Sequence, residues 1–444
     1  MSALADKPAE SRARGAGQWF GHPRGLTVLF LTQTWAEFSY FGLQAMLVYY
    51  MTQQLALPQA QASLIYGIYG ACAFFSPFFG GIVADRWIGK TAAVVIGGTL
   101  MMAGHFAMAF EPLLFPALGL VAVGNGLFIP PLAAQVARLY EDGDTRRDQA
   151  FSAYYMGINL GGFLSPLLCG YLGETYGWHW GFALAGVGMA VGLVTYLVGR
   201  RHVPGDESAK RERSARRPPL TRDDRRAVLA LLGVMAVVVL FRIAYEQSGN
   251  TIALWIADRT NRELAIGDWS WRIPATWFQS INPLLIITLT PFLMGHWQRR
   301  REQGHAANLF GRMALGCAIT AAACVVMVLA AIDYRLGGPV SALWVVGYFV
   351  LLTLGELLVL PVGLSLFGNL SPAQIASTMM GAWYIAKFLG SLSAGFIGTL
   401  WSTIPAEWFF AIGAGSTLLA SLILLVMASG RTPAPVAATQ SGGG

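Results

Sequence analysis

Long apolar runs separated by short polar segments dominate the pattern of hydrophobic and polar positions along this chain. The hydrocarbon core of a membrane is about 30 Å thick, and a helix needs roughly 20 apolar residues to cross it. Twelve runs of that kind are centred near residues 38, 72, 100, 126, 160, 190, 240, 285, 320, 353, 387 and 417. The pattern therefore predicts an all-α integral membrane protein with twelve transmembrane helices.

The longest polar interruption follows the sixth run and reads RRHVPGDESAKRERSARRPPLTRDDRR. Because it is charged, contains proline and is too polar to bury, we expect 201–226 to be a cytoplasmic linker between six-helix bundles at 26–200 and 227–428. Residues 1–25 are expected to form a cytoplasmic tail, and the low-complexity end at 429–444 a disordered one. Many secondary transporters share this plan and bind substrate between the halves at mid-membrane.

Composition supports the membrane interpretation and gives it an orientation. The 444 residues are 55% hydrophobic and 12% charged, whereas soluble domains carry about 25% charged residues. Lys and Arg accumulate on the cytoplasmic side of membrane proteins. With the N-terminus inside, 24 of the 30 lie in cytoplasmic segments and four in external loops. We therefore expect a multi-pass protein of the inner membrane with both termini in the cytoplasm, and no nucleic acid as partner.

The residues that most often carry catalysis or bind metals are placed like structural residues. Four cysteines, Cys72, Cys169, Cys317 and Cys324, lie in apolar runs without CxxC spacing, which favours small hydrophobes over disulfides or metal ligands. His105 is alone in its run, which favours a helix–helix hydrogen-bonding residue over a proton relay. We expect no enzyme activity, no metal and no cofactor.

Five charged residues lie well inside the predicted helices: Glu37, Arg242, Glu246, Glu356 and Lys387. A charge at the bilayer centre costs about 2.5–3.5 kcal/mol on insertion scales, so such residues usually line a polar pathway. The alternative is that the five only pair with one another to hold helices together. Helical spacing gives three shared faces: Gln33 with Glu37 and Tyr40, Arg242 with Glu246 and Asn250, and Trp383 with Lys387 and Ser391.

The segment GGIVADRWIGKT at 80–91 joins the second and third runs. Its Asp85, Arg86 and Lys90 can form a breakable ionic latch on the cytoplasmic side. The segment resembles the signature between the second and third helices of the major facilitator superfamily, which implies that superfamily's fold of two six-helix bundles. The alternative is an ordinary charged turn.

A more specific resemblance lies in FSAYYMGINLGGFLSPLLCGYLGETYGWHWGF at 151–182. This stretch is similar to the fifth-to-sixth-helix signature of the proton-dependent oligopeptide transporters, the POT or PTR2 family. The segments FGHPRG, SYFG, PATWFQSINPL and GELLVLPVGLS also resemble that family, so the resemblance covers about residues 20–400. It implies proton-coupled uptake of di- and tripeptides or peptide-like compounds by alternating access. The implied partners are a small-molecule or peptide substrate, protons and the lipid bilayer, and we expect a monomer.

The resemblance also implies roles for individual residues. Glu246 matches a seventh-helix glutamate that takes part in proton coupling and gating, and Glu356 matches a tenth-helix glutamate beside the peptide. The family's binding-site tyrosines, asparagines and tryptophan are matched by Tyr40, Tyr66, Asn159, Asn282 and Trp383. Each of these can instead be a residue that hydrogen-bonds a neighbouring helix.

The chain departs from the family at two motifs. The first-helix motif Glu-x-x-Glu-Arg is replaced by Gln33, Ala36 and Glu37, and the fourth-helix lysine by Ile129. The roles of those family residues in moving protons and holding the peptide carboxylate therefore do not carry over. The loss leaves two other functions open: transport of a non-peptide amphiphile, inward or outward, and a transport-dead sensor with the same fold.

Two cations inside helices compensate for the two that are lost. We hypothesise that Arg242 neutralises Glu37 or Glu246 across the contact between the first and seventh helices. Lys387, one turn beyond the matched tryptophan, would anchor the substrate's carboxylate. Glu37 then remains a cavity carboxylate that can titrate or attract a substrate amine.

Overall fold

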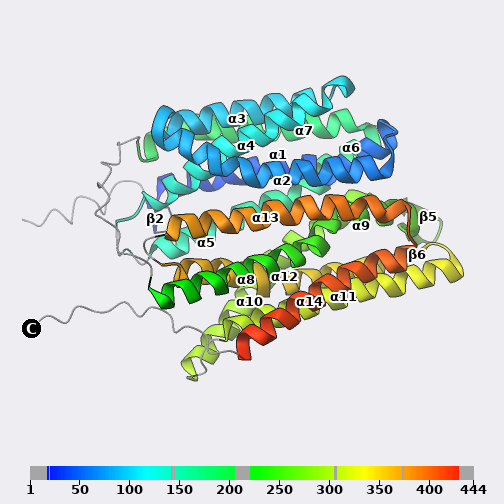
Figure 1. Ribbon diagram of the computed structural model, residues 1–444. Coiled ribbons are helices and arrows are strands. Elements are labelled where there is room, and N and C mark those ends of the chain that lie inside the picture. Colours follow the sequence, from blue (N-terminus) through cyan, green and yellow to red (C-terminus); the bar gives the residue numbers. More distant parts are fainter. Residues whose placement is uncertain are drawn as a thin grey trace, which may run out of the picture.

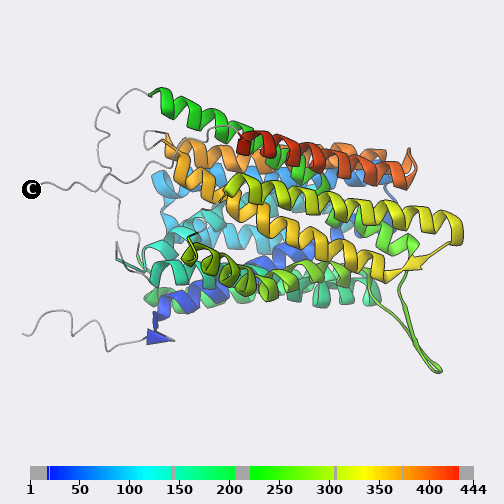
Figure 2. The same cartoon turned by 90° about the horizontal axis from the view of Figure 1, so that it is seen from below.

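The computed structural model describes residues 18–19, 21–141, 144, 146–205, 221–304, 308–372 and 375–429. They form a bundle of long helices lying side by side, with short two-stranded sheets at its ends (Figures 1 and 2). The predicted all-α class is confirmed. Eight helical stretches among the described residues are long and apolar enough to cross a membrane: 59–88, 111–137, 178–202, 224–259, 275–302, 309–337, 342–368 and 406–429.

The first half of the chain occupies the upper part of Figure 1. Its helices pack mainly as the pairs α3–α4, α1–α7, α1–α5 and α2–α4. Their bounds are α1 Arg24–Tyr49, η2 Tyr50–Gln54, α2 Gln59–Val83, η3 Ala84–Ile88, α3 Lys90–Ala107, η4 Glu111–Leu113, α4 Leu114–Ala137, α5 Arg146–Ser165, η5 Pro166–Gly170, α6 Tyr171–Tyr176, α7 Trp178–Gly199 and η6 Arg200–His202.

The second half packs mainly through α11–α14, α11–α12, α8–α13 and α8–α14. Its bounds are α8 Arg222–Tyr245, η7 Glu246–Gly249, α9 Thr251–Arg259, η8 Ala275–Ser280, α10 Ile281–Glu302, α11 Leu309–Gly337, α12 Ala342–Leu370, α13 Ala376–Gly398, η9 Thr399–Ser402 and α14 Ala406–Ser429. The strands pair as β1 Gln18–Trp19 with β2 His22–Pro23, β3 Thr260–Asn261 with β6 Val340–Ser341, and β4 Glu263–Ile266 with β5 Trp269–Arg272.

Helix α8 begins inside the segment that the sequence assigns to the linker at 201–226. Thr221 is its N-cap: the Thr221 hydroxyl accepts from the Asp224 N–H at 3.1 Å, and the Asp224 carboxylate accepts from the Thr221 N–H at 2.8 Å. This capping box satisfies otherwise unpaired backbone donors, so the helix can start among charged residues. The centre of the linker, 1–17 and 430–444 lie outside the described residues, so the predictions for these segments remain predictions.

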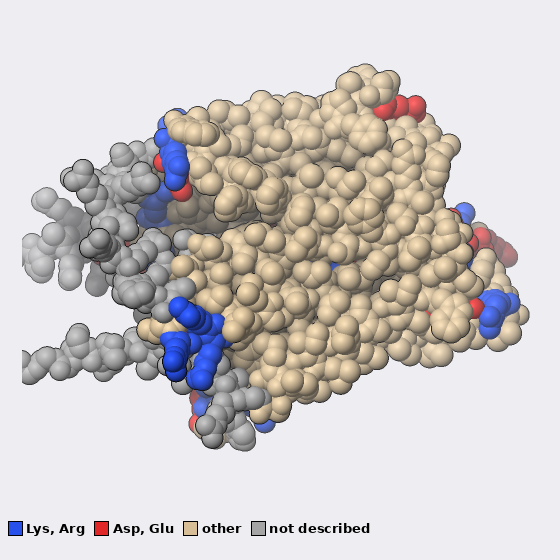
Figure 3. All heavy atoms as spheres, viewed as in Figure 1, with Lys and Arg blue, Asp and Glu red and all other residues tan. Residues whose placement is uncertain are grey.

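Charged side chains on the face shown in Figure 3 gather at the two ends of the bundle, and a broad uncharged belt separates them. We call the end that carries the β4–β5 hairpin the hairpin end (Figure 2). An uncharged belt between two charged rims is the surface expected of a membrane-spanning bundle.

The two halves touch along α2 and α13. A Cβ atom at Gly67 would lie 2.4 Å from the Cα of Gly395, so only glycine permits this approach of the two helices. Further along the same pair, the rings of Phe75 and Phe388 lie 5.1 Å apart. We call this contact the α2–α13 seam.

Hydrogen bonds join the halves at the hairpin end. The Tyr49 hydroxyl donates to the Ala253 carbonyl at 2.9 Å, and Gln279 Nε2 donates to the Ala45 carbonyl at 3.1 Å. These bonds hold α1 of the first half against α9 and η8 of the second.

The Glu174 carboxylate makes the densest of these contacts. It accepts from the backbone N–H groups of Ala275 and Thr276 at 2.9 and 2.8 Å and from the Thr276 hydroxyl at 2.7 Å. The Arg262 guanidinium lies 3.6 Å away. Burial lowers the pKa of Arg262 from its ordinary value, and the Glu174 charge opposes that shift. Glu174 therefore caps η8 from the other half of the molecule.

Candidate functional site

The helical path breaks between α8 and α9 in the second half of the chain. Helix α8 ends at Tyr245, a 3₁₀ turn follows over Glu246–Gly249, and Asn250 has φ −111° and ψ −97° before α9 begins. Irregular backbone at membrane depth is tolerated where it is buried in protein or lines a polar cavity. A Cβ at Gly249 would lie 2.1 Å from the Tyr66 hydroxyl oxygen, so the missing side chain lets Tyr66 reach the break.

Arg242 and Glu246 form a buried ion pair beside this break. They lie four residues apart, and the Arg242 guanidinium also approaches the Ser391 hydroxyl at 3.4 Å and lies 4.5 Å from the centre of the Phe74 ring. Of the two carboxylates proposed from the sequence, Arg242 thus neutralises Glu246. The prediction that this happens across the contact between the first and seventh helices is wrong, because the pair lies within one helical segment.

Glu356 is held by neutral donors from two other helices. Asn282 Nδ2 on α10 donates to it at 2.7 Å, and the Tyr245 hydroxyl on α8 donates at 3.1 Å. Asn282 Nδ2 also lies 3.0 Å from the Thr353 hydroxyl oxygen. Glu356 is only 7% exposed, and these donors partly offset the cost of removing it from water.

Glu37 is half-buried on α1 and lies at the end of a short hydrogen-bonded chain. Gln33 Nε2 donates to its carboxylate at 2.6 Å, and the Tyr154 hydroxyl on α5 donates to the Gln33 amide oxygen at 2.6 Å. No Lys, Arg or His nitrogen among the described residues lies within 4.0 Å of the Glu37 carboxylate. Glu37 is therefore a carboxylate without an ion-pair partner in this part of the chain.

Lys387 on α13 has aromatic neighbours. Its Nζ lies 5.2 Å from the centre of the Phe74 ring and 5.8 Å from that of Tyr384. Within the described ranges, no carboxylate oxygen comes within 4.0 Å of it. The Phe74 ring thus contacts both cations, Arg242 and Lys387, which places them on neighbouring helices at the same depth.

The remaining predicted site residues divide into two groups. Tyr40 stacks on Tyr69 with ring centres 6.2 Å apart, and both hydroxyls are buried without a hydrogen-bond partner in the described structure. Asn159 instead donates to the Tyr155 carbonyl within its own helix at 3.0 Å, and Trp383 packs in the core of the second half. In the described structure the Tyr40 hydroxyl is therefore available to hydrogen-bond a ligand, whereas the Asn159 side-chain amide already donates to a carbonyl of its own helix.

The family assignment rests on a comparison of sequences. The family model described as POT family matches residues 91–215 and 212–418. This chain belongs to the POT family. Members of this family are transporters and not enzymes, so the POT assignment places the chain among multi-pass membrane transporters.

Characterised relatives and solved structures agree with the POT assignment. The Di-/tripeptide transporter of Lactococcus lactis subsp. cremoris is 31% identical over 92% of this chain and 96% of its own length. The peptide transporter YePEPT of Yersinia enterocolitica subsp. palearctica is 32% identical over 86% of this chain and 89% of its own.

Two solved POT structures are similar over nearly their whole length. A peptide transporter POT in complex with sulfate has a TM-score of 0.83 and 32% identity, covering 93% of this chain and 95% of that one. A POT family transporter in complex with 5-aminolevulinic acid has a TM-score of 0.85 and 26% identity, covering 93% and 97%.

The predicted latch of this POT protein is only partly formed. Lys90 Nζ and a carboxylate oxygen of Asp85 lie 3.9 Å apart, while the Asp85 side chain is 67% exposed and Arg86 is exposed. An exposed pair of this kind contributes about 0–1 kcal/mol to stability.

The residues first considered for metal binding or hydrogen bonding have structural surroundings. In the part of the chain that the structure describes, no group of three or more His, Cys, Asp and Glu could hold a metal ion, and the cysteines are free. His105 is fully buried, and neither ring nitrogen has a partner there. The interpretation of His105 as a helix–helix hydrogen-bonding residue is therefore wrong for the described structure, because neither ring nitrogen forms such a bond there.

Four residues that contact the candidate site or join the two halves were missed from the sequence: Phe74, Tyr154, Glu174 and Tyr245. Tyr245 adjoins Glu246, and Glu174 lies inside the quoted signature, so both had a local signal. Phe74 and Tyr154 are reached only through contacts between different helices, which spacing along one helix does not reveal.

Proposed function

We propose that this POT protein imports di- and tripeptides or peptide-like compounds, coupled to protons, by alternating access. The observation that carries the proposal is a group of charged residues inside the bundle that includes unpaired charges of both signs. We call Glu37, Arg242, Glu246, Glu356 and Lys387 the central cluster. Glu37 and Lys387 lack ion-pair partners among the described residues, and Glu356 is held only by neutral donors. A peptide carries one charge of each sign and can compensate both.

The fold that we propose is the major facilitator fold, with twelve spans in bundles at 26–200 and 227–428. Helices α1, α3, α5 and α13 lie over the four remaining predicted runs and pack among the eight clear spans, which supports this number. We place both termini in the cytoplasm and the hairpin end outside the inner membrane. With the halves hydrogen-bonded at the hairpin end, the central cluster would face the cytoplasm, and Asp85, Arg86 and Lys90 would form the latch there.

The orientation of the substrate in the site would follow from the positions of the unpaired charged groups. Lys387 would bind the substrate's carboxylate, since no neighbouring carboxylate competes for it within the described chain. Glu37 or Glu356 would attract the amino group. The polar and aromatic wall between them would comprise Tyr40, Tyr66, Asn159, Asn282 and Trp383.

Proton coupling would use the three carboxylates of the cluster. Protonation of Glu246 would release Arg242, and the freed guanidinium could then pair with another carboxylate, which changes the contacts between the halves. Each proton that enters gains about 2.3 kcal/mol per 100 mV of membrane potential. Glu37 and Glu356 would exchange protons as the substrate amine arrives and leaves. We propose that one chain works alone as a monomer.

A second candidate is transport of a non-peptide amphiphile. The favouring observation is the first-helix sequence, where Gln33 and Ala36 replace two acids and Gln33 is bound by Tyr154. A solved relative is bound to 5-aminolevulinic acid, which carries an amine and a carboxylate without a peptide bond. Such a molecule would bind Lys387 through its carboxylate and Glu37 or Glu356 through its amine.

Uptake into proteoliposomes with an imposed pH gradient tests both proposals. Accumulation of labelled dipeptide that collapses with the gradient supports the first. Uptake of 5-aminolevulinic acid that dipeptides do not inhibit supports the second. Binding of either compound without any flux would contradict both and favour the transport-dead sensor.

A further inference from the structure

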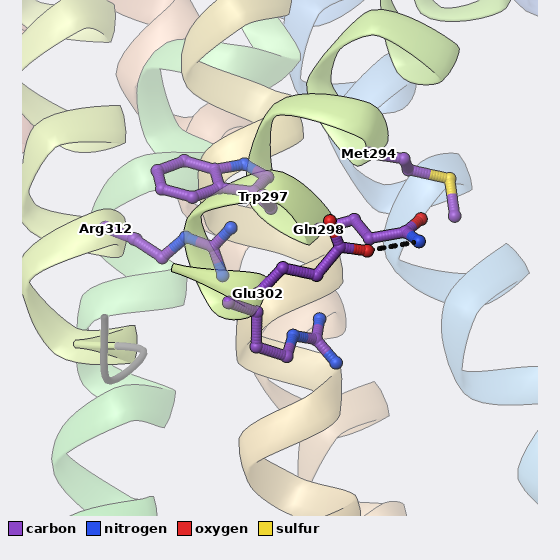
Figure 4. Close-up of a pocket in the computed structure, with 6 residues that line it drawn as sticks. Met294, Trp297, Gln298, Glu302 and Arg312 are labelled. Carbon is purple, nitrogen blue, oxygen red and sulfur yellow. Dashed lines mark hydrogen bonds between the residues drawn. The ribbon is translucent and has the colours of Figure 1, made fainter. Parts of the chain in front are cut away.

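A cavity lies far along α10 from Arg242, Glu356 and Lys387, at the end of the bundle opposite the β4–β5 hairpin. It has a volume of about 600 Å³ and sits between the end of α10 and the start of α11 (Figure 4). Its lining residues are Met294, Trp297, Gln298, Arg301, Glu302 and Arg312. None of these takes part in the proposed transport site.

The surroundings of this cavity are strongly positive. Arg299, Arg300 and Arg301 occupy the last turn of α10, and Arg312 lies near the start of α11. The one carboxylate in the lining, Glu302, accepts from Gln298 Nε2 at 3.0 Å. Among the described residues, no carboxylate lies within 4.0 Å of any of these four arginines. Four cations thus share one small region with a single acid, Glu302, which accepts a hydrogen bond from Gln298 in the same lining.

Arg312 is held in place at the cavity wall. Its guanidinium carbon lies 3.3 Å from the centre of the Trp297 ring, and Figure 4 shows the two side chains together on one side of the cavity. Its Nε is buried and has no hydrogen-bond partner in the described structure. Stacking on an aromatic ring fixes a guanidinium and leaves its edge for an acceptor. The acceptor that suits such a donor fork is a phosphate or carboxylate.

An apolar surface adjoins the cavity. Met294, which lines the cavity, is 60% exposed, and Phe292, two residues earlier on α10, is 77% exposed. Two residues turn a helix by about 200°, so Phe292 lies on another face and Met294 is the residue that continues the cavity wall. Both belong to the uncharged part of the helix that precedes the arginines. A ligand that fills the cavity and continues along this surface would need a phosphate at one end and a hydrocarbon chain at the other.

We propose that this cavity binds the phosphodiester headgroup of an anionic phospholipid. Arg301 and Arg312 hold the phosphate, and an acyl chain lies against Met294. Basic pockets at the cytoplasmic ends of membrane helices bind such headgroups. The accumulation of Lys and Arg on one membrane side explains the charge alone, but it requires neither a cavity nor a guanidinium stacked on Trp297. The proposal is independent of the proposed transport function.

The test measures lipid binding to the purified full chain by native mass spectrometry, with phosphatidylglycerol and phosphatidylcholine of the same acyl chains. Two double variants each remove two positive charges from the region where α10 ends and α11 begins. Arg301→Gln with Arg312→Gln changes the cavity, and Arg299→Gln with Arg300→Gln changes its neighbours. We expect the wild type to prefer phosphatidylglycerol, and the cavity variant to lose roughly tenfold or more of that affinity. The neighbour variant should lose much less.

Two outcomes would overturn the proposal. Equal loss in both double variants would mean that surface charge alone attracts the lipid. Displacement of phosphatidylglycerol by millimolar inorganic phosphate or glycerol 3-phosphate would mean that the cavity takes soluble phosphate instead. Thermal unfolding and size-exclusion profiles confirm that each variant is folded. If the cavity variant does not fold, Trp297→Leu, which removes only the stacking partner, should reduce phosphatidylglycerol binding in its place.

Discussion

Arg242 and Lys387 occupy the same depth of the bundle and contact the same Phe74 ring, yet their surroundings differ. Arg242 on α8 has its own carboxylate, Glu246, four residues away. Lys387 on α13 has aromatic rings and no carboxylate within 4.0 Å among the described residues. The first charge is neutralised inside the protein, whereas we propose that the second binds the carboxylate of a substrate.

The difference separates two uses of an intramembrane charge. Breaking a buried ion pair strands the remaining charge, so its members contribute to folding whatever else they do. An unpaired charge contributes no such stabilisation and persists where it faces a polar pathway. Substitutions should therefore affect stability at Arg242 and transport at Lys387.

The largest effect on stability is expected for Arg242→Met. It leaves Glu246 buried without its cation and should lower the free energy of unfolding by about 3–5 kcal/mol. Thermal unfolding in detergent measures the loss. The double variant Arg242→Met with Glu246→Leu removes both charges and should recover most of the stability. A double variant as unstable as the single one would show that the ion pair is not the cause.

Lys387→Ala should abolish uptake while the protein stays folded. Loss of the anchor for a carboxylate is expected to reduce uptake roughly 100-fold, which corresponds to about 2.7 kcal/mol. Proteoliposome uptake and an unfolding curve, measured on the same preparation, separate the two effects. Lys387→Arg keeps the charge and should retain part of the activity. Unimpaired uptake by Lys387→Ala would refute the anchor role.

Glu174→Gln tests whether a carboxylate outside the central cluster affects stability without affecting substrate binding. Glu174 accepts three hydrogen bonds from the other half at the hairpin end. Loss of the charge should lower stability by about 1–2 kcal/mol, because hydrogen bonds to a charged group are stronger than those to a neutral one. The substrate concentration for half-maximal uptake should stay within about twofold. A large change in that concentration would place Glu174 in substrate binding.

Tyr245→Phe should have the smallest effect. It removes the hydroxyl that donates to Glu356 at 3.1 Å but keeps the ring that stacks on Phe241. Since Asn282 still donates to Glu356, we expect a loss of about 0.5–1.5 kcal/mol in stability. Asn282→Leu is the matched variant for the other donor, and the two losses measured by unfolding show how they share the carboxylate.

Contacts within one helix were predictable, and contacts between helices were not. Spacing of four residues placed Gln33 beside Glu37 and Arg242 beside Glu246, and the structure confirms both contacts. Phe74 could not be foreseen as the shared neighbour of two cations, because the rotation of each helix is set by packing against the others. The linker shows a similar limit, since the charge run around Thr221 favours a loop, whereas Thr221 caps α8 in the structure.

The α2–α13 seam has a mechanical consequence. At Gly67 and Gly395 the two backbones meet with no side chain between them, so neither helix can approach further or shear past a bulky group. We expect α2 and α13 to pivot about this close contact. When the helices separate at one end of the bundle, we expect them to draw together at the other end.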